Sequence, residues 1–480
     1  MKKLNQLIEC DYDININSIE EDSRIKADDA LFCCIEGLTV DGHNFVNSAI
    51  ENGAVAVIAS KEINISVPVI KVNDTNKAMG NILSNFYDNA DKKLALIGVT
   101  GTDGKTTLTS IIYQLINNFD ECGLIGTNGV ECSYFTKDSK FTTPFPKELY
   151  SFLNDFHQAG CKYVTMETTS ERLGTDRLSE LQFDIGIFTN ISKDHLNTHK
   201  TMENYVEAKC KLFALIKNDG YAIINNDDDY SKTFINASNG NVITYGIENE
   251  ADVMAKDIVV TEKLLTFTLT APYGEFKVLS PLSGKFNVYN LIAAITTCHI
   301  LGFDIEKVIE KVGSLKQIDA RCLYVECGQP FKVMVDYAHT GNAIKNLLEF
   351  VKTFVKGKII LVTGSAGHRD ISRRIDIGEV VIKHADYIIF TSEDPRTEDP
   401  LKLINDMLST TKEDVSNYEI IIDRTEAIKK ALSIAKRDDL VLIVGKGKED
   451  YMEIGNEYVP YITDYRVAEQ YLKEEVKKHH

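Results

Sequence analysis

Several classes of protein are excluded by what the sequence lacks. None of the ten cysteines forms a CxxC pair, and most stand in apolar runs, so a disulfide framework or a zinc site is not expected. No run of about 18 apolar residues occurs, so no membrane-spanning helix is expected. Met1-Lys2-Lys3 is followed by polar Asn5 and Gln6 instead of an apolar stretch, which argues against a signal peptide. Buried thiols and the missing signal predict a cytoplasmic protein.

Positive charge is also in short supply. Lys and Arg total 53 against 71 Asp and Glu, a net charge of −18. Binding to nucleic acid or to an anionic membrane needs an excess of cations on one face, so neither partner is expected. A local phosphate pocket is compatible with this balance, because a few backbone N–H groups can hold such a ligand.

The length of 480 residues corresponds to about three domains at roughly 150 residues each. No repeat or low-complexity linker marks their limits, so the division rests on pattern. We expect domains over residues 1–90, 91–314 and 315–480. Short apolar strands alternating with helices predict an α/β protein with parallel sheets. In the last domain the alternation is regular, which predicts a doubly wound, Rossmann-like fold with its site at the carboxyl ends of the strands.

The clearest elements are apolar runs and amphipathic stretches. Strands are expected over 30–35, 54–59, 94–99, 163–166, 185–188, 332–335, 359–362, 387–390 and 440–444. Helices are expected over 45–53, 105–117, 287–301, 343–355 and 371–384.

The strongest motif runs from Gly98 to Thr107, where a buried strand enters a glycine-rich turn and a helix follows. Backbone N–H groups of such a turn cradle phosphate oxygens. Lys105 is expected to contact the β- and γ-phosphates and Thr106 to ligate Mg²⁺. Five residues, not the usual four, separate Gly98 from Gly104. The motif predicts nucleoside triphosphate binding in a central ATPase domain, through Gly101, Thr102, Gly104, Lys105, Thr106 and Thr107.

Further polar residues follow neighbouring strands. Glu167 ends the strand over 163–166, His195 follows the strand over 185–188, and Lys209 lies on a later helix. Ends of neighbouring parallel strands meet at one edge, so Glu167 and His195 can reach a metal beside the phosphate loop. Mg²⁺ prefers carboxylate and water, so His195 is either a ligand, a capping residue or a histidine that contacts a ligand without touching the metal. Lys209 alone is typical of a solvated helix lysine.

Short motifs recur along nearly the whole chain: Asp22-Ser23-Arg24, Asp41-Gly42-His43, Gly98 to Thr107, Thr142-Thr143-Pro144, Glu167 to Ser170, Phe188-Thr189-Asn190, Asp194-His195-Leu196, Thr201-Met202-Glu203, Ala208-Lys209, Gly284-Lys285-Phe286-Asn287, Asp336 to Thr340, Asp394-Pro395-Arg396 and Gly445-Lys446-Gly447. In these motifs and their order the sequence resembles the Mur ligases of peptidoglycan precursor synthesis, and among them the MurE type.

The resemblance implies a three-domain, ATP-dependent amide ligase. ATP would phosphorylate a carboxylate of UDP-N-acetylmuramoyl-dipeptide, and the amine of a diamino acid would displace the phosphate. Such chemistry rests on positioning and on cations that neutralise crowded oxygens. The implied cofactors are ATP and Mg²⁺, with a carbamylated Lys209 whose added negative charge can orient a second Mg²⁺. We expect a monomer.

The resemblance also implies roles for individual residues. The catalytic set is Lys105, Glu167, His195 and Lys209. The metal ligands are Thr106, Glu167, His195 and Lys209. Further ATP contacts are Asn287, Asn290, Arg321, Asp336 and His339. The UDP-muramoyl-peptide contacts are Ser23, Thr142, Thr143, Ser170 and Arg177. The residues for the incoming amino acid are Asp394, Arg396, Gly445 and Glu449.

Some motifs depart from the family pattern. Where the family has Val-Ser-Ser-His-Ala, this chain has Thr168-Thr169-Ser170-Glu171-Arg172. The diaminopimelate type has Asp-Asn-Pro-Arg where this chain has Glu393-Asp394-Pro395-Arg396. A guanidinium at Arg396 suits a distal carboxylate and Glu449 a distal ammonium, which favours meso-diaminopimelate. The extra negative charge of Asp394 would favour a cationic side chain, so lysine or another diamino acid stays open.

Two other functions remain open beside the MurE type. One is a catalytically inactive nucleotide-binding protein on a Mur fold; the intact Lys105, Glu167 and Lys209 argue against it. The other is a related ligase, either folylpolyglutamate synthase or a MurE-like paralogue that joins another amino acid to another carboxylate. Ser23-Arg24 and Asp41-Gly42-His43 favour a UDP-sugar domain over one for folate.

Overall fold

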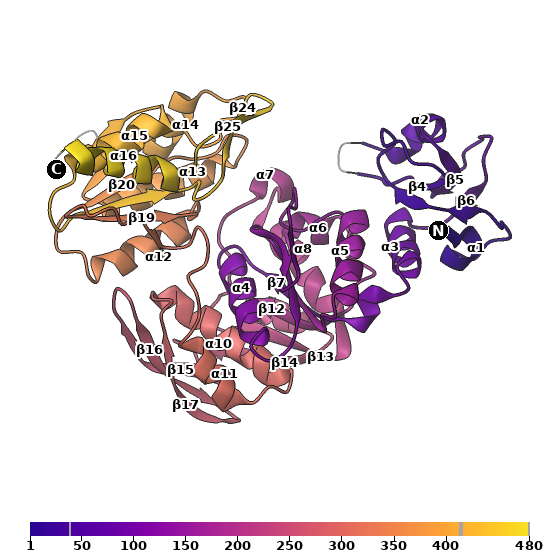
Figure 1. Ribbon diagram of the computed structural model, residues 1–480, viewed down its shortest axis with the longest axis horizontal. Coiled ribbons are helices and arrows are strands. Elements are labelled where there is room, and N and C mark those ends of the chain that lie inside the picture. The colour runs from indigo at the N-terminus through magenta and orange to yellow at the C-terminus, as the bar shows by residue number, and fades with distance from the viewer. Residues whose placement is uncertain (38–39, 412–415, 479–480) are drawn as a thin grey trace.

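The computed structural model describes residues 1–37, 40–411 and 416–478 and has three lobes (Figure 1). The N-terminal and C-terminal lobes lie on opposite sides of the central one. Each lobe has its own mainly parallel sheet, with strands over 18–71, 95–280 and 323–444. The α/β prediction is therefore confirmed. Among the described residues no helix is long and apolar enough to cross a bilayer.

The N-terminal lobe is a four-stranded parallel sheet in the order β3-β4-β5-β6, beside a small β1-β2 pair. The predicted helix over 45–53 is a 3₁₀ turn followed by a short α-helix, because Asp41 caps the turn by accepting from the N–H of His43. The elements are β1 (Lys2–Lys3), α1 (Leu4–Leu7), β2 (Asn15–Ile16), β3 (Ser18–Glu20), β4 (Ala30–Cys33), η1 (Gly42–Phe45), α2 (Val46–Glu51), β5 (Ala54–Ala59), β6 (Val69–Lys71) and α3 (Thr75–Phe86).

The central lobe has an 11-stranded sheet in the order β10-β9-β8-β11-β7-β12-β13-β14-β15-β16-β17. The seven strands β8, β11, β7, β12, β13, β14 and β15 run parallel, and the antiparallel strands β9 and β10 at one edge and β16 and β17 at the other extend the sheet. Its first elements are η2 (Ala90–Lys93), β7 (Ala95–Thr100), α4 (Lys105–Ile116), β8 (Cys122–Gly126), β9 (Gly129–Cys132), β10 (Phe135–Lys137), α5 (Pro146–Gln158), β11 (Tyr163–Glu167), α6 (Ser170–Gly174) and β12 (Phe183–Phe188). They are followed by α7 (Leu196–His199), α8 (Met202–Ala214), β13 (Ile216–Asn225), α9 (Ser231–Asn236), β14 (Asn241–Gly246), β15 (Val253–Val260), β16 (Leu265–Ala271), β17 (Gly274–Ser280), α10 (Lys285–Ile300) and α11 (Ile305–Val312).

The C-terminal lobe has a six-stranded sheet in the order β18-β19-β23-β20-β21-β22, parallel except for β18. The helix predicted over 343–355 starts earlier, because the Thr340 hydroxyl caps it at the N–H of Ala343. The elements are β18 (Leu323–Tyr324), β19 (Lys332–Asp336), α12 (Gly341–Lys352), β20 (Ile359–Thr363), α13 (Ile371–His384), β21 (Tyr387–Phe390), α14 (Pro400–Leu408), β22 (Tyr418–Ile420), α15 (Arg424–Ile434), β23 (Leu440–Val444), β24 (Tyr451–Ile454), β25 (Glu457–Pro460) and α16 (Asp464–Lys478).

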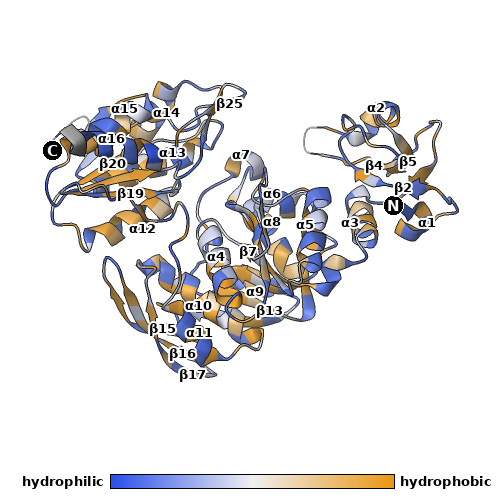
Figure 2. Cartoon of the chain, in the orientation of Figure 1, coloured by the Kyte–Doolittle hydropathy of each residue, from blue (hydrophilic) through white to orange (hydrophobic). Residues whose placement is uncertain are grey.

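Hydrophobic residues concentrate on the strands and on the helix faces that cover them (Figure 2). All ten cysteines are free, and seven of them are buried in this core. Strand β7 lies between β11 and β12, so the ends of all three strands come out beside the glycine-rich turn. That arrangement is what positions the candidate site.

Candidate active site

The glycine-rich turn begins at Gly101 and not at Gly98. Gly98 lies inside β7, where a Cβ would come within 2.7 Å of Leu212 and 2.9 Å of the Phe183 ring, so its small size serves packing. In the turn itself Gly101 has φ +146° and Gly104 φ +87°, which favour glycine. A Cβ on Gly101 would lie 1.9 Å from the hydroxyl of Thr189. The unusual spacing from Gly98 is therefore explained by strand packing.

Lys105 folds back on its own loop. Its Nζ donates to the carbonyl oxygens of Gly101 at 3.0 Å and Thr102 at 2.9 Å. Phosphate oxygens are stronger acceptors for an ammonium than these neutral carbonyls, so the side chain is poised to exchange one for the other. Thr102 itself turns inward, with its hydroxyl 3.1 Å from that of Tyr205 and its backbone N–H donating to the Asn190 carbonyl at 2.8 Å. Thr107 is buried on α4.

Thr106 and Glu167 meet as the order of strands predicts. The Thr106 hydroxyl donates to Oε1 of Glu167 at 2.9 Å, and the same oxygen accepts from the backbone N–H of Thr127 at 2.8 Å. Glu167 is 1% exposed and stands at the end of β11. A hydroxyl and a carboxylate at the base of a phosphate loop are hard oxygen donors, so this pair fits Mg²⁺.

Lys209 is buried, and the interpretation of a solvated helix lysine is wrong. Helix α8 turns this side chain inward, where Nζ donates to the carbonyl of Gly101 at 2.7 Å and lies 4.6 Å from the ring centroid of Tyr205. Burial, and then repulsion by the Lys105 ammonium, hold the pKa of Lys209 well below its usual range. A neutral amine can react with CO₂, so the site fits a carbamylated lysine.

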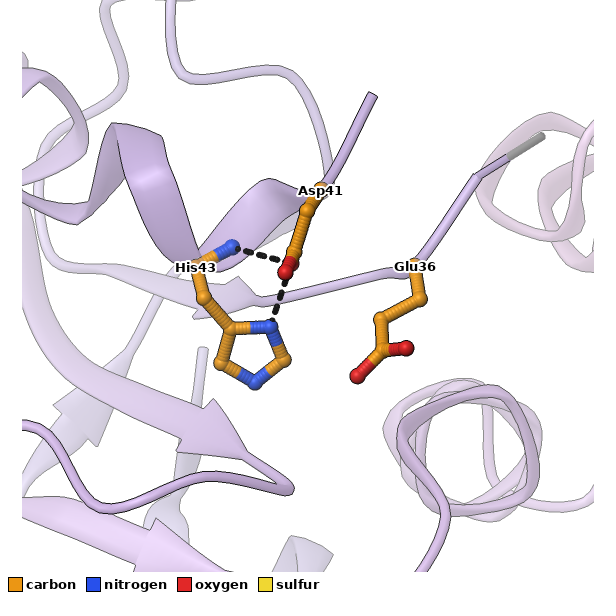
Figure 3. Close-up of side chains that lie close together, drawn as sticks. All are labelled: Glu36, Asp41 and His43. Carbon is orange, nitrogen blue, oxygen red and sulfur yellow. Dashed lines mark hydrogen bonds and ion pairs between the residues drawn. The ribbon is translucent and has the colours of Figure 1, made fainter. Parts of the chain in front are cut away.

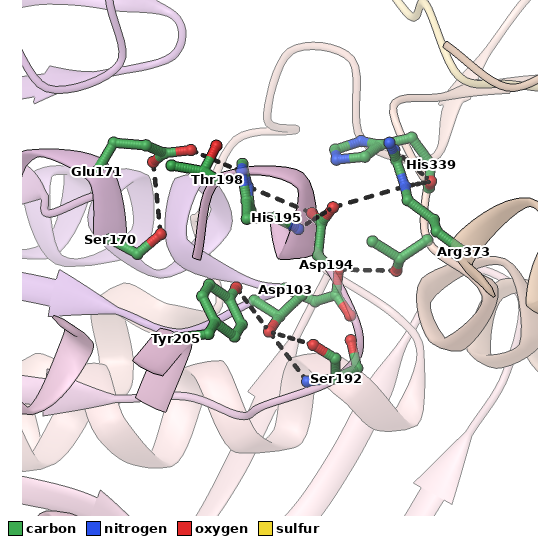
Figure 4. Close-up of polar contacts among 12 residues, drawn as sticks. Asp103, Ser170, Glu171, Ser192, Asp194, His195, Thr198, Tyr205, His339 and Arg373 are labelled. Carbon is green, nitrogen blue, oxygen red and sulfur yellow. Dashed lines mark hydrogen bonds and ion pairs between the residues drawn. The ribbon is translucent and has the colours of Figure 1, made fainter. Parts of the chain in front are cut away.

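His195 stands at the N-terminus of α7 with a left-handed backbone, φ +55°, but its ring does not cap the helix. Instead Nδ1 lies 2.6 Å from Oε1 of Glu171 and Nε2 lies 3.3 Å from Oδ2 of Asp194 (Figure 4). The capping alternative is therefore wrong as far as the side chain is concerned. Two carboxylates face the ring, and the sequence analysis gave a role to neither.

Another cluster has the spacing of metal ligands. In the described part of the chain, only Glu36, Asp41 and His43 bring three such ligand atoms within 4.8 Å of one another (Figure 3). Local bonds account for it, because Asp41 accepts from His43 Nδ1 at 2.6 Å and from Lys61 Nζ at 2.6 Å. Among the described residues, Glu167 and His195 are not part of such a group of three His, Cys, Asp or Glu ligand atoms.

The C-terminal lobe reaches the phosphate loop directly. Asp103, between the two turn glycines, accepts from the Thr340 hydroxyl at 3.0 Å and from Asn342 Nδ2 at 3.3 Å. Nearby, Nε of Arg373 on α13 lies 3.6 Å from Asp194 (Figure 4). Asp103 and Arg373 were not predicted as site residues, because contacts between lobes leave no mark on the local sequence pattern.

The residues predicted to contact the rest of ATP lie on both lobes. Asn287 and Asn290 are buried on α10, linked at 3.1 Å, and Oδ1 of Asn290 is 3.1 Å from where a Gly104 Cβ would stand. In the C-terminal lobe, Asp336 accepts from the N–H groups of Cys322 and Ala338, both at 2.7 Å. The guanidinium carbon of Arg321 lies 5.1 Å from the ring centroid of Tyr337. His339 is buried, and burial lowers its pKa to about 3.

The predicted acceptor-substrate residues divide between two lobes. Ser23 lies in the N-terminal lobe, where its carbonyl accepts from Asn52. The Thr143 hydroxyl donates to the Glu167 carbonyl at 2.8 Å, so it lies beside the end of β11. Arg177 pairs with Glu21 at 2.5 Å across the lobes. The other two sit on the central lobe: Thr142 is 3.2 Å from the Thr127 hydroxyl, and Ser170 is 3.0 Å from Nε2 of His199.

The predicted amino-acid residues form ion pairs with their neighbours. Both oxygens of Asp394 accept from Lys446 Nζ, at 2.8 and 2.9 Å, so a cation lies beside the negative charge that Asp394 adds. Arg396 donates to Glu453 at 2.6 Å and to the Gly367 carbonyl at 2.9 Å. The last two are also constrained: Glu449 pairs with Lys446, and a Cβ on Gly445 would lie 2.1 Å from Glu393.

Together the three lobes and the phosphate loop define a multi-domain enzyme that uses a nucleoside triphosphate. Three family models match successive parts of the chain: "Mur ligase family, catalytic domain" over 15–87, "Mur ligase middle domain" over 99–298 and "Mur ligase, glutamate ligase domain" over 320–447. The chain belongs to the Mur ligase family, whose members are ATP-dependent ligases that form amide bonds.

Individual relatives are similar over their whole length. The chain is 38% identical to the UDP-N-acetylmuramoyl-L-alanyl-D-glutamate–2,6-diaminopimelate ligase of Bacillus cereus, covering 98% of both chains. It is 37% identical to the ligase of the same name in Listeria monocytogenes, covering 96% of both. A solved structure with that name has 30% identity and a TM-score of 0.71 and covers 100% of this chain and 99% of its own. MurF of Thermotoga maritima in complex with ADP, at 19% identity, TM-score 0.67 and coverage of 96% and 98%, shares the fold.

Proposed function

We propose that this protein joins meso-diaminopimelate to UDP-N-acetylmuramoyl-L-alanyl-D-glutamate with the hydrolysis of ATP to ADP and phosphate. The observation that carries the proposal is similarity over the full length to ligases named for this reaction, at 37–38% identity. The ten free cysteines and the need for ATP support a cytoplasmic setting.

In the proposed reaction a substrate carboxylate oxygen attacks the γ-phosphorus of ATP, and ADP leaves. The amine of the amino acid then attacks the carbonyl carbon of the acyl phosphate, and the tetrahedral intermediate expels phosphate. Lys105 and the backbone of the turn would hold the β- and γ-phosphates. Thr106 and Glu167 would bind one Mg²⁺, while His195 and carbamylated Lys209 would bind a second; these ions would neutralise negative charge on the reacting oxygens.

Support for a carbamylated Lys209 comes from its surroundings. The side chain is 2% exposed, and its Nζ contacts a backbone carbonyl and an aromatic ring. A permanently charged ammonium in such a place is costly. The amine would add to CO₂ with loss of one proton, which gives an anionic carbamate that suits Mg²⁺.

Support for diaminopimelate over lysine comes from Arg396. Two of its guanidinium nitrogens are held by Glu453 and Gly367, which fixes the group beside the loops that follow β20 and β21. Lys446 pairs with both Asp394 and Glu449, so a cation lies beside the charge that Asp394 adds. A carboxylate on the distal carbon of the amino acid would find a fixed arginine.

The test is phosphate release by the purified protein with ATP, Mg²⁺ and UDP-N-acetylmuramoyl-L-alanyl-D-glutamate, with meso-diaminopimelate or L-lysine as the amine. The expected result is release that needs all substrates and a higher kcat/KM with diaminopimelate. A preference for lysine would overturn the amino-acid assignment. ATP binding without turnover for any amine would support the inactive Mur-fold alternative instead.

A further inference from the structure

Glu171 is a carboxylate that the proposed reaction has so far left unused. It lies on α6, and its Oε1 stands 2.6 Å from Nδ1 of His195. Although Nδ1 is buried, it makes no hydrogen bond of acceptable geometry with any described group. Nδ1 of His195 and Oε1 of Glu171 are thus close together, but their relative orientation is not that of a hydrogen bond.

Two donors in this arrangement are placed like neighbouring ligands of one cation. With metal–ligand bonds of about 2.1 Å, adjacent ligands of an octahedral Mg²⁺ stand about 3 Å apart. The observed 2.6 Å between Glu171 and His195 needs only a small opening to reach that separation. A buried nitrogen that lacks a hydrogen-bonding partner is explained if its lone pair is meant for a metal.

The surroundings connect this pair to the phosphate loop. Tyr205 packs 5.9 Å from the His195 ring and 4.6 Å from Nζ of Lys209, while its hydroxyl lies 3.1 Å from that of Thr102. His195, Lys209 and the loop therefore surround one aromatic ring.

We propose that Glu171 is a metal ligand, which joins His195 in binding the second divalent cation beside the phosphate loop. This rests on the proposed function, since that function supplies the need for a second cation. In the related motif the position of Glu171 is a histidine, so this chain would have exchanged an imidazole for a carboxylate. Carboxylate oxygen suits hard cations such as Mg²⁺ and Mn²⁺, whereas imidazole suits Zn²⁺, Co²⁺ and Ni²⁺.

The experiment measures Mn²⁺ binding by electron paramagnetic resonance and calorimetry, with a non-hydrolysable ATP analogue present. Glu171→Gln keeps the shape of the side chain and removes its charge, so we expect one class of Mn²⁺ sites to weaken roughly 10- to 100-fold. Glu207→Gln is the matched control, because Glu207 is an exposed glutamate on α8, and binding should match the wild type. Glu171→His should recover binding for Co²⁺ better than for Mn²⁺.

A crystal of the Mn²⁺ complex then separates a ligand from a residue that only positions His195. Anomalous scattering should place Mn²⁺ within about 2.2 Å of a Glu171 oxygen. Unchanged Mn²⁺ affinity in Glu171→Gln, or a Mn²⁺ ion bound to His195 but not to Glu171, would overturn the inference. If Mn²⁺ binding depends on Glu171 but no amine supports phosphate release, the proposed function fails while the metal site stands.

Discussion

The phosphate loop and the amino-acid region achieve their geometry in different ways. In the loop, Lys105 and Thr106 follow directly on the turn, and glycines at positive φ shape the main chain that would hold phosphate. The amino-acid region is assembled from side chains after β21 and β23, with left-handed backbone at the non-glycine residues Asp394 and Arg396. Strained backbone of this kind persists only where its surroundings enforce it.

The two regions also differ in how charge is balanced. Lys105 contacts neutral carbonyls, whereas in the amino-acid region the carboxylates of Asp394, Glu449 and Glu453 pair with the cations of Lys446 and Arg396. An ammonium that contacts only neutral acceptors can bind an anion without breaking an ion pair. In the amino-acid region an existing ion pair must break before a charged group of the substrate can bind. The comparison indicates that ATP chemistry is encoded locally, whereas amino-acid choice depends on a network that few substitutions can retune.

The largest effect is expected for Lys105→Ala. Loss of a cation aimed at the developing phosphate charge should lower kcat by about 10²- to 10³-fold. Melting temperature should hardly change, because Lys105 bonds only to carbonyls of its own loop. Phosphate-release kinetics and thermal unfolding check this, with Lys307→Ala on exposed α11 as the control. Near-normal kcat would break the contrast between the two regions.

Lys209→Ala should cost nearly as much, about 10²-fold in kcat, because the anionic carbamate is lost. ATP binding should persist, and acetate should restore part of the activity by placing a carboxylate in the vacated space. Kinetics with and without acetate give the answer. Lys211→Ala, which removes an exposed lysine paired with Asp176 on the same helix, should behave like the wild type. Full activity of Lys209→Ala without acetate would rule out a catalytic role for the carbamate.

Arg396→Ala is expected to act mainly on substrate affinity. Removing one charged contact to a carboxylate costs about 1.5–3 kcal/mol, so KM for diaminopimelate should rise roughly 10- to 100-fold, with a smaller change in kcat. Steady-state kinetics at varied diaminopimelate test this, and Arg466→Ala on exposed α16 is the control. Equal loss of ATP affinity would contradict a local role in amino-acid binding.

The smallest effect concerns stability at Glu393. Burial raises the pKa of Glu393 to about 7, above the 4.5 of a free glutamate. A carboxyl whose pKa is raised by folding makes its full contribution to the free energy of unfolding below pH 4.5, where it is protonated in both states. That contribution is lost as pH rises through 7. Glu393→Gln should therefore raise melting temperature more at pH 8 than at pH 5. Exposed Glu457→Gln should show no such difference between the two pH values.

Much of the fold could be predicted from sequence. The strand over 54–59 and the helix over 371–384 match β5 and α13 residue for residue, because apolar periodicity and capping residues mark their ends. The strand predicted over 185–188 begins two residues earlier, at Phe183, because the end of a strand depends on its pairing, here with β13. The boundaries at 90 and 314 between the domains stay predictions.

The candidate site was predictable where chemistry follows the chain. Thr106 and Glu167 come together because β7 and β11 are parallel neighbours. Burial of Lys209 could not be read from α8 alone, because its inward face depends on how the helix packs. The carboxylates around His195 were missed for the same reason.

The sequence by itself determined the phosphate loop, the alternation of strands and helices and the family resemblance, since these depend on residues close together in the chain. Only the tertiary structure decided that Lys209 is buried against Gly101, that Lys446 neutralises Asp394, and that Asp103 meets Thr340 across two lobes. The physical reason is that burial and ion pairing are properties of packed neighbours. Such neighbours lie here up to 239 positions apart in the chain, as Asp103 and Asn342 do.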